Sequence, residues 1–144
     1  MDDLPSRLAA RGRSPLMENL GVAVSLEDGH PVIRLRVDER HLRSHNIAHG
    51  GFLCTVLDTA LGAAAYETLG DDASVELVTA QLNVNFLRPA WNGEEIVARG
   101  EVVHAGRQTM VITGRIETAA GQPVVTGSGT FMRVEIPPQP SADE

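Results

Sequence analysis

The stretch from residue 51 to residue 69 constrains the fold more than any other part of this 144-residue chain. Apolar residues recur there at intervals of three and four positions, the period of one face of an α-helix. They are Leu53, Val56, Leu57, Ala60, Leu61, Ala64 and Ala65. At ~1.5 Å per residue the stretch predicts a helix roughly 28 Å long, enough to cross a small domain, and Gly70 is placed to end it.

Composition limits the class of protein. With 42% hydrophobic and 22% charged residues the chain reads as one globular domain. A net charge of −7 argues against a general binder of nucleic acid or of anionic membranes. All 12 cations are arginines, which excludes Schiff-base catalysis by lysine and a phosphate-loop lysine.

The compartment is inferred from what the sequence lacks. The single cysteine, Cys54, permits no intramolecular disulfide and fits a reducing compartment. We see no basic, apolar leader after Met1 and no apolar run long enough to span a membrane. We therefore expect a cytoplasmic protein.

The remaining strand signals predict a sheet. Residues 22–26 and 32–37 flank an Asp28-Gly29 turn and read as a hairpin. Four further strands are expected, joined by connections too short for crossovers, so most pairs should be antiparallel. They span residues 75–87, 94–104, 107–118 and 123–134. Glycines inside these strands indicate a sheet that curls closely around something, and the long helix is the object available.

The expected fold is therefore α+β, with a curved, mainly antiparallel sheet of about six strands wrapped around one long central helix. Residues 14–21 predict a short helix, with Pro15 near its start and Gly21 at its end. Residues 1–13 are expected to form a mobile or weakly helical lead-in, residues 14–136 the domain, and residues 137–144 a disordered tail.

Asp58 is the residue that points to chemistry. Aspartate has poor helix propensity, and a buried carboxylate is costly unless it is paired or hydrogen-bonded. Its neighbours one turn away are Cys54 and Gly62, both small, which leaves room for a ligand. At Gly50-Gly51 the unpaired N–H groups and the positive end of the helix dipole can hold an oxyanion. A carboxylate and an oxyanion site on one helix suggest acyl transfer.

Other readings of these residues are weaker. His45, His49 and Asp58 could form a two-histidine, one-carboxylate metal site only if a helix ran through Gly50-Gly51, so we expect no metal and no cofactor. Cys54 as a nucleophile competes with the commoner role of a lone helical cysteine as core filler. A serine esterase would need a Gly-x-Ser-x-Gly elbow, which Gly127-Ser128-Gly129 does not supply.

Three motifs in order resemble one family. They are residues 14–21 (SPLMENLG), His49-Gly50-Gly51 with Asp58 nine residues after the histidine, and residues 83–90 (NVNFLRPA). Together they resemble the hotdog-fold acyl-CoA thioesterases, in particular the PaaI-like branch named for phenylacetic acid degradation. The resemblance covers residues 14–134 and implies at least a dimer, a homodimer or a homotetramer, with active sites at the subunit interface.

The resemblance also implies roles for residues of the site. Asp58 would be the general base or the nucleophile, and the Gly50 N–H would polarise the thioester carbonyl. His49 would orient the reactants, and Thr79 would hold the attacking water. Family members usually carry Asn or Gln six residues before the histidine, where this chain has Arg43.

The substrate contacts follow from the same resemblance. Asn46 or His45 could take over the role of the missing amide, and of the two Asn46 is carried as the candidate; otherwise the range of substrates would differ. Arg88 and Arg107 fall at strand ends that could meet the phosphates of coenzyme A. Gly51 and Phe52, at the helix start, are expected to contact the substrate.

The expected activity is hydrolysis of acyl-CoA thioesters of the medium-chain or aryl type. The alternative is a hotdog domain that binds acyl-CoA as a sensor or scaffold without catalysis and would not need Asp58. Hydratases of acyl thioesters use other motifs on this fold, and the sequence does not match them.

Overall fold

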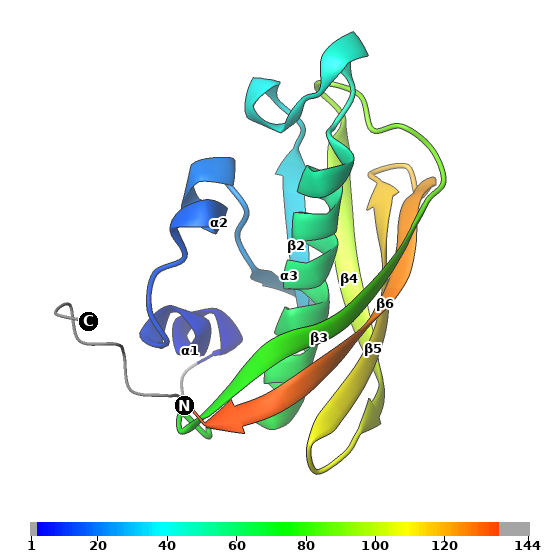
Figure 1. Ribbon diagram of the computed structural model, residues 1–144. Coiled ribbons are helices and arrows are strands. Elements are labelled where there is room, and N and C mark those ends of the chain that lie inside the picture. Colours follow the sequence, from blue (N-terminus) through cyan, green and yellow to red (C-terminus); the bar gives the residue numbers. More distant parts are fainter. Residues whose placement is uncertain (1–2, 136–144) are drawn as a thin grey trace, which may run out of the picture.

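A computed structural model describes residues 3–135, in which one six-stranded sheet curves around a long helix (Figure 1). The helices are α1 (Leu4–Ala10), α2 (Pro15–Leu20) and α3 (Gly50–Leu69), with two 3₁₀ turns at Glu39–His41 and Ser44–Asn46. The strands are β1 (Ser25–Glu27), β2 (His30–Arg36), β3 (Val75–Phe86), β4 (Glu95–Ala105), β5 (Thr109–Thr118) and β6 (Pro123–Glu135). The predicted tail at residues 137–144 lies outside the described residues.

The strands pair in the order β1-β2-β4-β5-β6-β3, and every pair is antiparallel. This confirms the predicted sheet and hairpin. In the β1–β2 turn Glu27 pairs with His30, and Asp28 and Gly29 adopt φ values of 52° and 78°. These left-handed conformations match the right-handed twist of the flanking strands. β3 comes first after α3 in the chain but lies at the edge of the sheet, beside β6.

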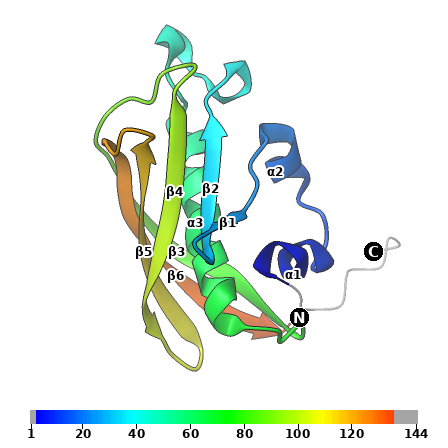
Figure 2. The ribbon, with the colours of Figure 1, turned by 180° about the vertical axis from the view of Figure 1, so that it is seen from behind.

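The core lies between α3 and the sheet. All seven residues of the predicted helical stripe are buried, and in the view from behind β2 and β4 lie in front of α3 (Figure 2). At Gly114 of β5, a Cβ atom would lie 2.5 Å from Leu61 Cδ2. The glycine therefore lets α3 approach the sheet closely, as predicted.

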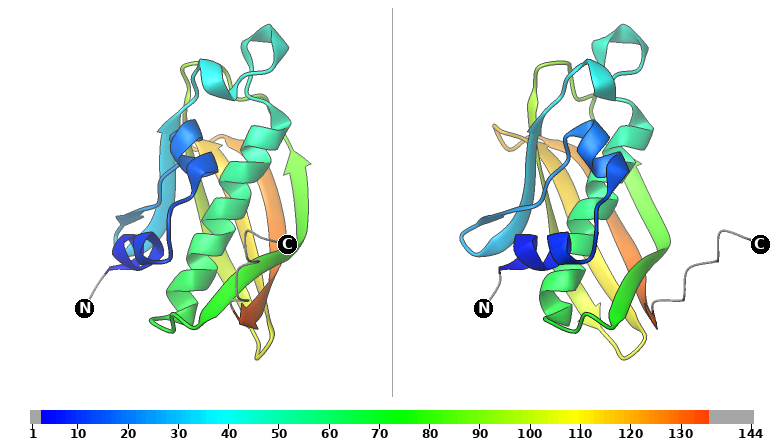
Figure 3. Two further views of the ribbon diagram at one scale, coloured as in Figure 1. Left: turned by 60° about the vertical axis from the view of Figure 1, so that its left-hand side comes forward. Right: turned by 90° about the vertical axis from the view of Figure 1, so that its left-hand side faces the viewer.

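The first two helices lie on the open side of α3, and α1 also contacts strand β1 (Figure 3). α1 and α2 flank α3 on the side away from β4 and β5 (Figure 3). Asp3 caps α1 by accepting a hydrogen bond from the Ser6 N–H at 2.9 Å, and Gly21 ends α2 in the left-handed conformation. No helix among residues 3–135 is long and apolar enough to cross a membrane.

Candidate active site

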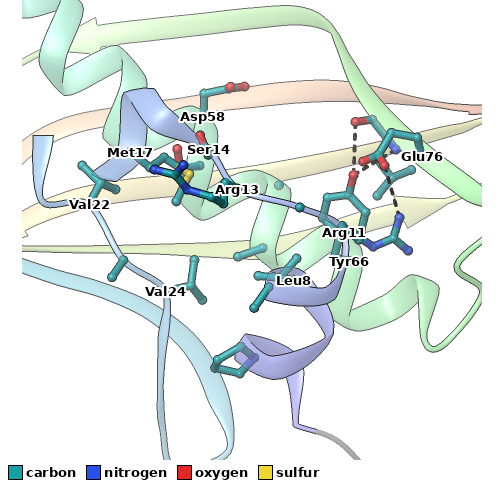
Figure 4. A pocket seen from close by; sticks show the side chains of 18 of the residues that line it. Leu8, Arg11, Arg13, Ser14, Met17, Val22, Val24, Asp58, Tyr66 and Glu76 are labelled. Carbon is teal, nitrogen blue, oxygen red and sulfur yellow. Dashed lines mark hydrogen bonds and ion pairs between the residues drawn. The ribbon is translucent and has the colours of Figure 1, made fainter. Parts of the chain in front are cut away.

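A cavity of about 540 Å³ lies between α3 and the two N-terminal helices (Figure 4). Its volume is in the range of ligand sites, roughly 300–1,000 Å³. The apolar part of its wall comes mainly from Leu8, Met17, Val22, Val24, Leu77 and Phe131. The cavity is therefore a partly open, mainly apolar cleft lined by the N-terminal segment, α3 and strands β3 and β6.

Asp58, Gly62 and Tyr66 of α3 all line this cavity and are spaced four residues apart. Residues at that spacing lie on one face of a helix, so the three form a stripe along the cavity. Gly62 leaves the middle of the stripe without a side chain, as the sequence analysis proposed. The carboxylate thus sits at one end of an open channel, and the tyrosine ring lies about 12 Å further along the helix axis.

Asp58 is half-buried, and its carboxylate has a partner. Thr79 of β3 donates its hydroxyl proton to Asp58 Oδ1 at 2.7 Å. The hydroxyl oxygen keeps lone pairs that can accept a hydrogen bond from a water molecule. The two residues can therefore hold a water between them at the mouth of the cavity.

At the start of α3, the N–H groups of Gly50 and Phe52 have no acceptor within the described residues, whereas that of Gly51 has one. The Gly51 N–H donates to Nδ1 of His49, the N-cap residue, at 2.8 Å. The imidazole proton is therefore assigned to Nε2. The Gly50 N–H has no acceptor in the described part of the chain. Of the two glycine donors predicted together, that of Gly50 is therefore open, whereas that of Gly51 orients the His49 ring.

Gly50 and Asp58 do not meet within one subunit. They are eight positions apart in α3, about 12 Å along the axis. One thioester carbonyl can be reached only by groups within hydrogen-bond distance, roughly 3 Å from each. A complete site built from both residues needs a second copy of the chain.

The loop before α3 is fixed by a buried histidine. His41 Nδ1 accepts from the Asp38 N–H at 3.0 Å, and its Nε2 lies 2.7 Å from the Leu20 carbonyl oxygen. Its ring stacks on Phe52 with 4.0 Å between centroids. Phe52, expected to contact substrate, is thus a core residue here and does not line the cavity described above.

Asn46 and Arg43 lie on the exposed surface of the same loop. Asn46 has a φ of 65°, and its carbonyl accepts from the Asn92 N–H at 2.9 Å. Arg43 donates to its neighbour Ser44 at 3.2 Å. The backbone of Asn46 therefore ties the loop to the β3–β4 connection, while its side chain is exposed near the start of α3.

The two candidate phosphate-binding arginines lie at opposite ends of the sheet. The Arg88 N–H donates to Val124 at the start of β6, while Arg107 lies in the β4–β5 hairpin. The ten residues of β5, about 33 Å of strand, separate these positions, and Figure 1 shows the hairpin far from the start of α3. One subunit cannot bring both arginines to one phosphate group.

The alternative chemistries find little support in the geometry. Burial, reinforced by the negative charge of Asp58, raises the pKa of the Cys54 thiol, which disfavours the nucleophilic thiolate. Among residues 3–135 no three His, Cys, Asp or Glu side chains gather as a metal site.

The N-terminal wall of the cavity is the part that sequence reasoning missed. Leu8 and Arg11 belong to the segment expected to be a mobile or weakly helical lead-in with little function, yet both line the cavity. Asp3 followed by Pro5 was the available signal, since this pair is typical of a helix start.

Comparisons with known proteins show which family the chain belongs to. Residues 45–125, more than half of the chain, match the profile of the Thioesterase superfamily. The chain belongs to this superfamily. The match spans the helix start, Asp58 and Thr79.

Relatives within the superfamily share both sequence and fold. Over 88 residues the chain is 31% identical to acyl-coenzyme A thioesterase PaaI of Escherichia coli, covering 61% of this chain and 59% of PaaI. The solved structure of PaaI, from the phenylacetic acid degradation operon, has a TM-score of 0.77 at 25% identity over 92% of this chain and 96% of that one.

Another solved structure similar to this chain was determined with coenzyme A. BH2602 of Bacillus halodurans, solved with CoA, has a TM-score of 0.80 at 28% identity and covers 93% of this chain and 90% of its own. These similarities confirm the hotdog fold and the PaaI-like resemblance inferred from the motifs.

Proposed function

We propose that the protein hydrolyses acyl-CoA thioesters of the medium-chain or aryl type. The observation that carries this proposal is Asp58, which lies in an apolar cavity and accepts a hydrogen bond from Thr79. A carboxylate placed there can remove a proton from a water that Thr79 orients, and general bases contribute roughly 10²–10⁴ in rate. The names of PaaI and of BH2602, solved with CoA, support the substrate class.

The reaction needs an oxyanion donor, and we assign it to Gly50 of the partner subunit. As water attacks the thioester carbon, negative charge develops on the carbonyl oxygen, and a helix N–H fixed in advance stabilises it. Asp58 receives the water proton and can return it to the departing thiolate of CoA. Products are the free acid and CoA.

A single two-fold axis between two subunits could pair both their α3 helices and their β3 edges, because two contacts within each subunit link the same positions of α3 and β3. Thr79 contacts Asp58, and Phe86 lies against Gly50, whose Cβ would be 3.5 Å from the Phe86 ring. In an antiparallel pair of α3 helices, an axis near Cys54 sets Gly50 opposite Asp58 of the partner subunit. For paired β3 edges, an axis between residues 82 and 83 sets Thr79 opposite Phe86 of the partner subunit.

The β3 edge is suited to this pairing. β3 has 12 residues, and within the described chain only one of its edges is paired. Val78, Phe86 and Leu87 at this edge are 42%, 55% and 53% exposed. A long, partly apolar edge strand is a template for a second chain.

The first test is thiol release from aryl-, short-, medium- and long-chain acyl-CoAs by the wild type and by Asp58→Asn. We expect the variant to bind acyl-CoA and to lose at least about 100-fold in kcat. Full turnover by a folded Asp58→Asn protein would contradict the proposal. Binding without turnover by the wild type would favour the sensor or scaffold.

The shared site is tested with Gly50→Pro, which removes the proposed donor at the first position of α3, where proline is tolerated. His49 already has φ −64° and ψ 136°, which a following proline accepts. We expect a loss of about 10²–10³ in kcat. Gly50→Ala keeps the N–H and is the matched control.

Mixing the two inactive variants tests whether each active site is shared between two subunits. A mixed dimer of Asp58→Asn and Gly50→Pro contains one doubly altered site and one intact site if each site spans the interface. Random reassociation should then restore about a quarter of wild-type activity. A site confined to one subunit would show no recovery.

A further inference from the structure

We infer that Tyr66 is the end wall of the acyl site and limits the length of the acyl chain that the protein accepts. This inference rests on the proposed hydrolase function. It assigns a specificity-determining residue in α3 and gives α1 a role in substrate selection.

The two ends of the cavity are lined by different residues. Asp58 and Thr79 line the cavity at one end, while Tyr66, Arg11 and Glu76 line it at the other (Figure 4). Between them Gly62 and Ala63 leave α3 without bulky side chains. A thioester held at Asp58 therefore has an apolar path along α3 toward the Tyr66 ring.

The far end of the channel is closed by paired polar groups. The Tyr66 hydroxyl accepts from the Leu77 N–H at 3.1 Å and donates to the Leu77 carbonyl at 3.4 Å. These bonds fix the ring against β3, so the ring cannot swing away without losing them. A longer chain would have to break both bonds to displace the ring, and the loss of hydrogen bonds opposes its passage.

Arg11 secures α1 against this wall. Its guanidinium lies 4.5 Å from the centre of the Tyr66 ring and is only 16% exposed. It donates to the Val75 carbonyl at 2.7 Å and to the Asp72 carbonyl at 3.0 Å. Arg7, one turn earlier, pairs with Asp71 at 3.3 Å. The end of the channel is therefore bounded by Tyr66 and by a firmly anchored helix.

The available length fits a medium chain. Asp58 and Tyr66 are eight positions apart, about 12 Å along the helix axis. An extended chain advances about 1.2 Å per bond, so about ten bonds fill this distance. Decanoyl should fit, and myristoyl should exceed the channel.

The test is the chain-length profile of kcat/KM for butyryl-, octanoyl-, decanoyl-, myristoyl- and palmitoyl-CoA. In the wild type we expect kcat/KM to rise about fourfold for each buried methylene up to decanoyl-CoA. From decanoyl-CoA to myristoyl-CoA we expect kcat/KM to fall at least about tenfold. Tyr66→Ala should move the fall to longer chains. Tyr66→Phe keeps the ring but loses both hydroxyl bonds to Leu77, so its fall should shift by less than that of Tyr66→Ala.

Gly62→Leu provides an independent variant, because it blocks the channel without touching the Tyr66 hydrogen bonds. A Cβ at Gly62 would lie 3.6 Å from Phe131, an ordinary contact, so a side chain can begin at this position without a clash, and the rest of the leucine would enter the cavity that Gly62 lines. This variant should lose octanoyl and decanoyl turnover and retain butyryl turnover.

The outcomes separate the two proposals. Asp58-dependent thiol release with the same chain-length profile in wild type, Tyr66→Ala and Gly62→Leu would overturn the end wall and leave the hydrolase standing. No thiol release from any acyl-CoA by the wild type would overturn the hydrolase itself.

Discussion

Thr79 of β3 donates a hydrogen bond of 2.7 Å to Asp58 of α3, across 21 positions of sequence. Aspartate has poor helix propensity, and the Asp58 carboxylate is half-buried, so both features cost stability. The hydrogen bond offsets part of that cost. It also couples the central helix to the edge strand. The proposed catalytic base therefore depends on the strand at which we place the subunit interface.

Replacing Thr79 by Ala should lower kcat by about 10- to 100-fold. The variant loses a hydrogen bond to a charged group, worth about 1.5–3 kcal/mol, at the place where the water must be oriented. Thr79→Ser keeps the hydroxyl and should recover most of the rate. The comparison is kcat for a medium-chain acyl-CoA, with Thr113→Ala, at an exposed position of β5, as control. Equal rates for Thr79→Ala and Thr79→Ser would contradict the role.

Local periodicity explains why so much of the fold could be predicted. The stripe from Leu53 to Ala65 repeats with the helical period, and Asp28-Gly29 demands a tight hairpin turn. The connections between β4, β5 and β6 are too short for the crossovers that parallel strands need, so these strands pair antiparallel. Each of these signals involves only a few neighbouring residues, so it can be recognised from the sequence alone.

The arrangement of the site depends on contacts that local patterns do not encode. The Gly51 N–H donates to His49 only because the histidine adopts a particular side-chain rotamer, which the sequence does not show. The separation of Arg88 from Arg107 follows from strand direction across the whole sheet. The place of α1 depends on Arg11, whose partners lie more than 60 residues away. The roles of Asp58, His49 and Gly50 in catalysis stay predictions.

The same substitution should have opposite effects at two glycines. Gly62→Ala replaces glycine inside α3 with the best helix former and should stabilise the fold by up to about 1 kcal/mol. Gly114→Ala would place Cβ 2.5 Å from Leu61 Cδ2 and 2.6 Å from the Arg99 carbonyl oxygen. Overpacking of this kind costs about 1–3 kcal/mol. Urea unfolding of both variants measures the difference, and a stabilised Gly114→Ala would be the contrary result.

Cys54→Ala should leave kcat within about twofold of wild type. Burial and the neighbouring Asp58 raise the pKa of this thiol, so little thiolate forms at neutral pH. Alkylation by iodoacetamide should accordingly be slow compared with a free thiol. A loss of activity as deep as that of Asp58→Asn would instead identify Cys54 as the nucleophile.

Asp38 should make stability depend on pH in the acid range. The Arg40 guanidinium bonds both carboxylate oxygens, at 3.1 and 2.9 Å, and lowers the pKa of Asp38 from 3.8 to about 2. Because the folded pKa is depressed, the stabilisation is present above pH 3.8 and is lost as pH falls to about 2. Asp38→Asn should therefore be less stable than wild type at neutral pH, and the gap should shrink on acidification.

Thermal unfolding of wild type and Asp38→Asn across this range measures that gap. The control is Asp28→Asn, which removes a carboxylate from the exposed β1–β2 turn and leaves Arg40 untouched. The Asp38 carboxylate also accepts from the Arg40 N–H at 3.0 Å at the start of the 3₁₀ turn that carries His41. Its protonation should loosen the loop that leads into α3. A gap that stays constant from neutral pH to pH 2 would show that Arg40 does not stabilise the ionised form.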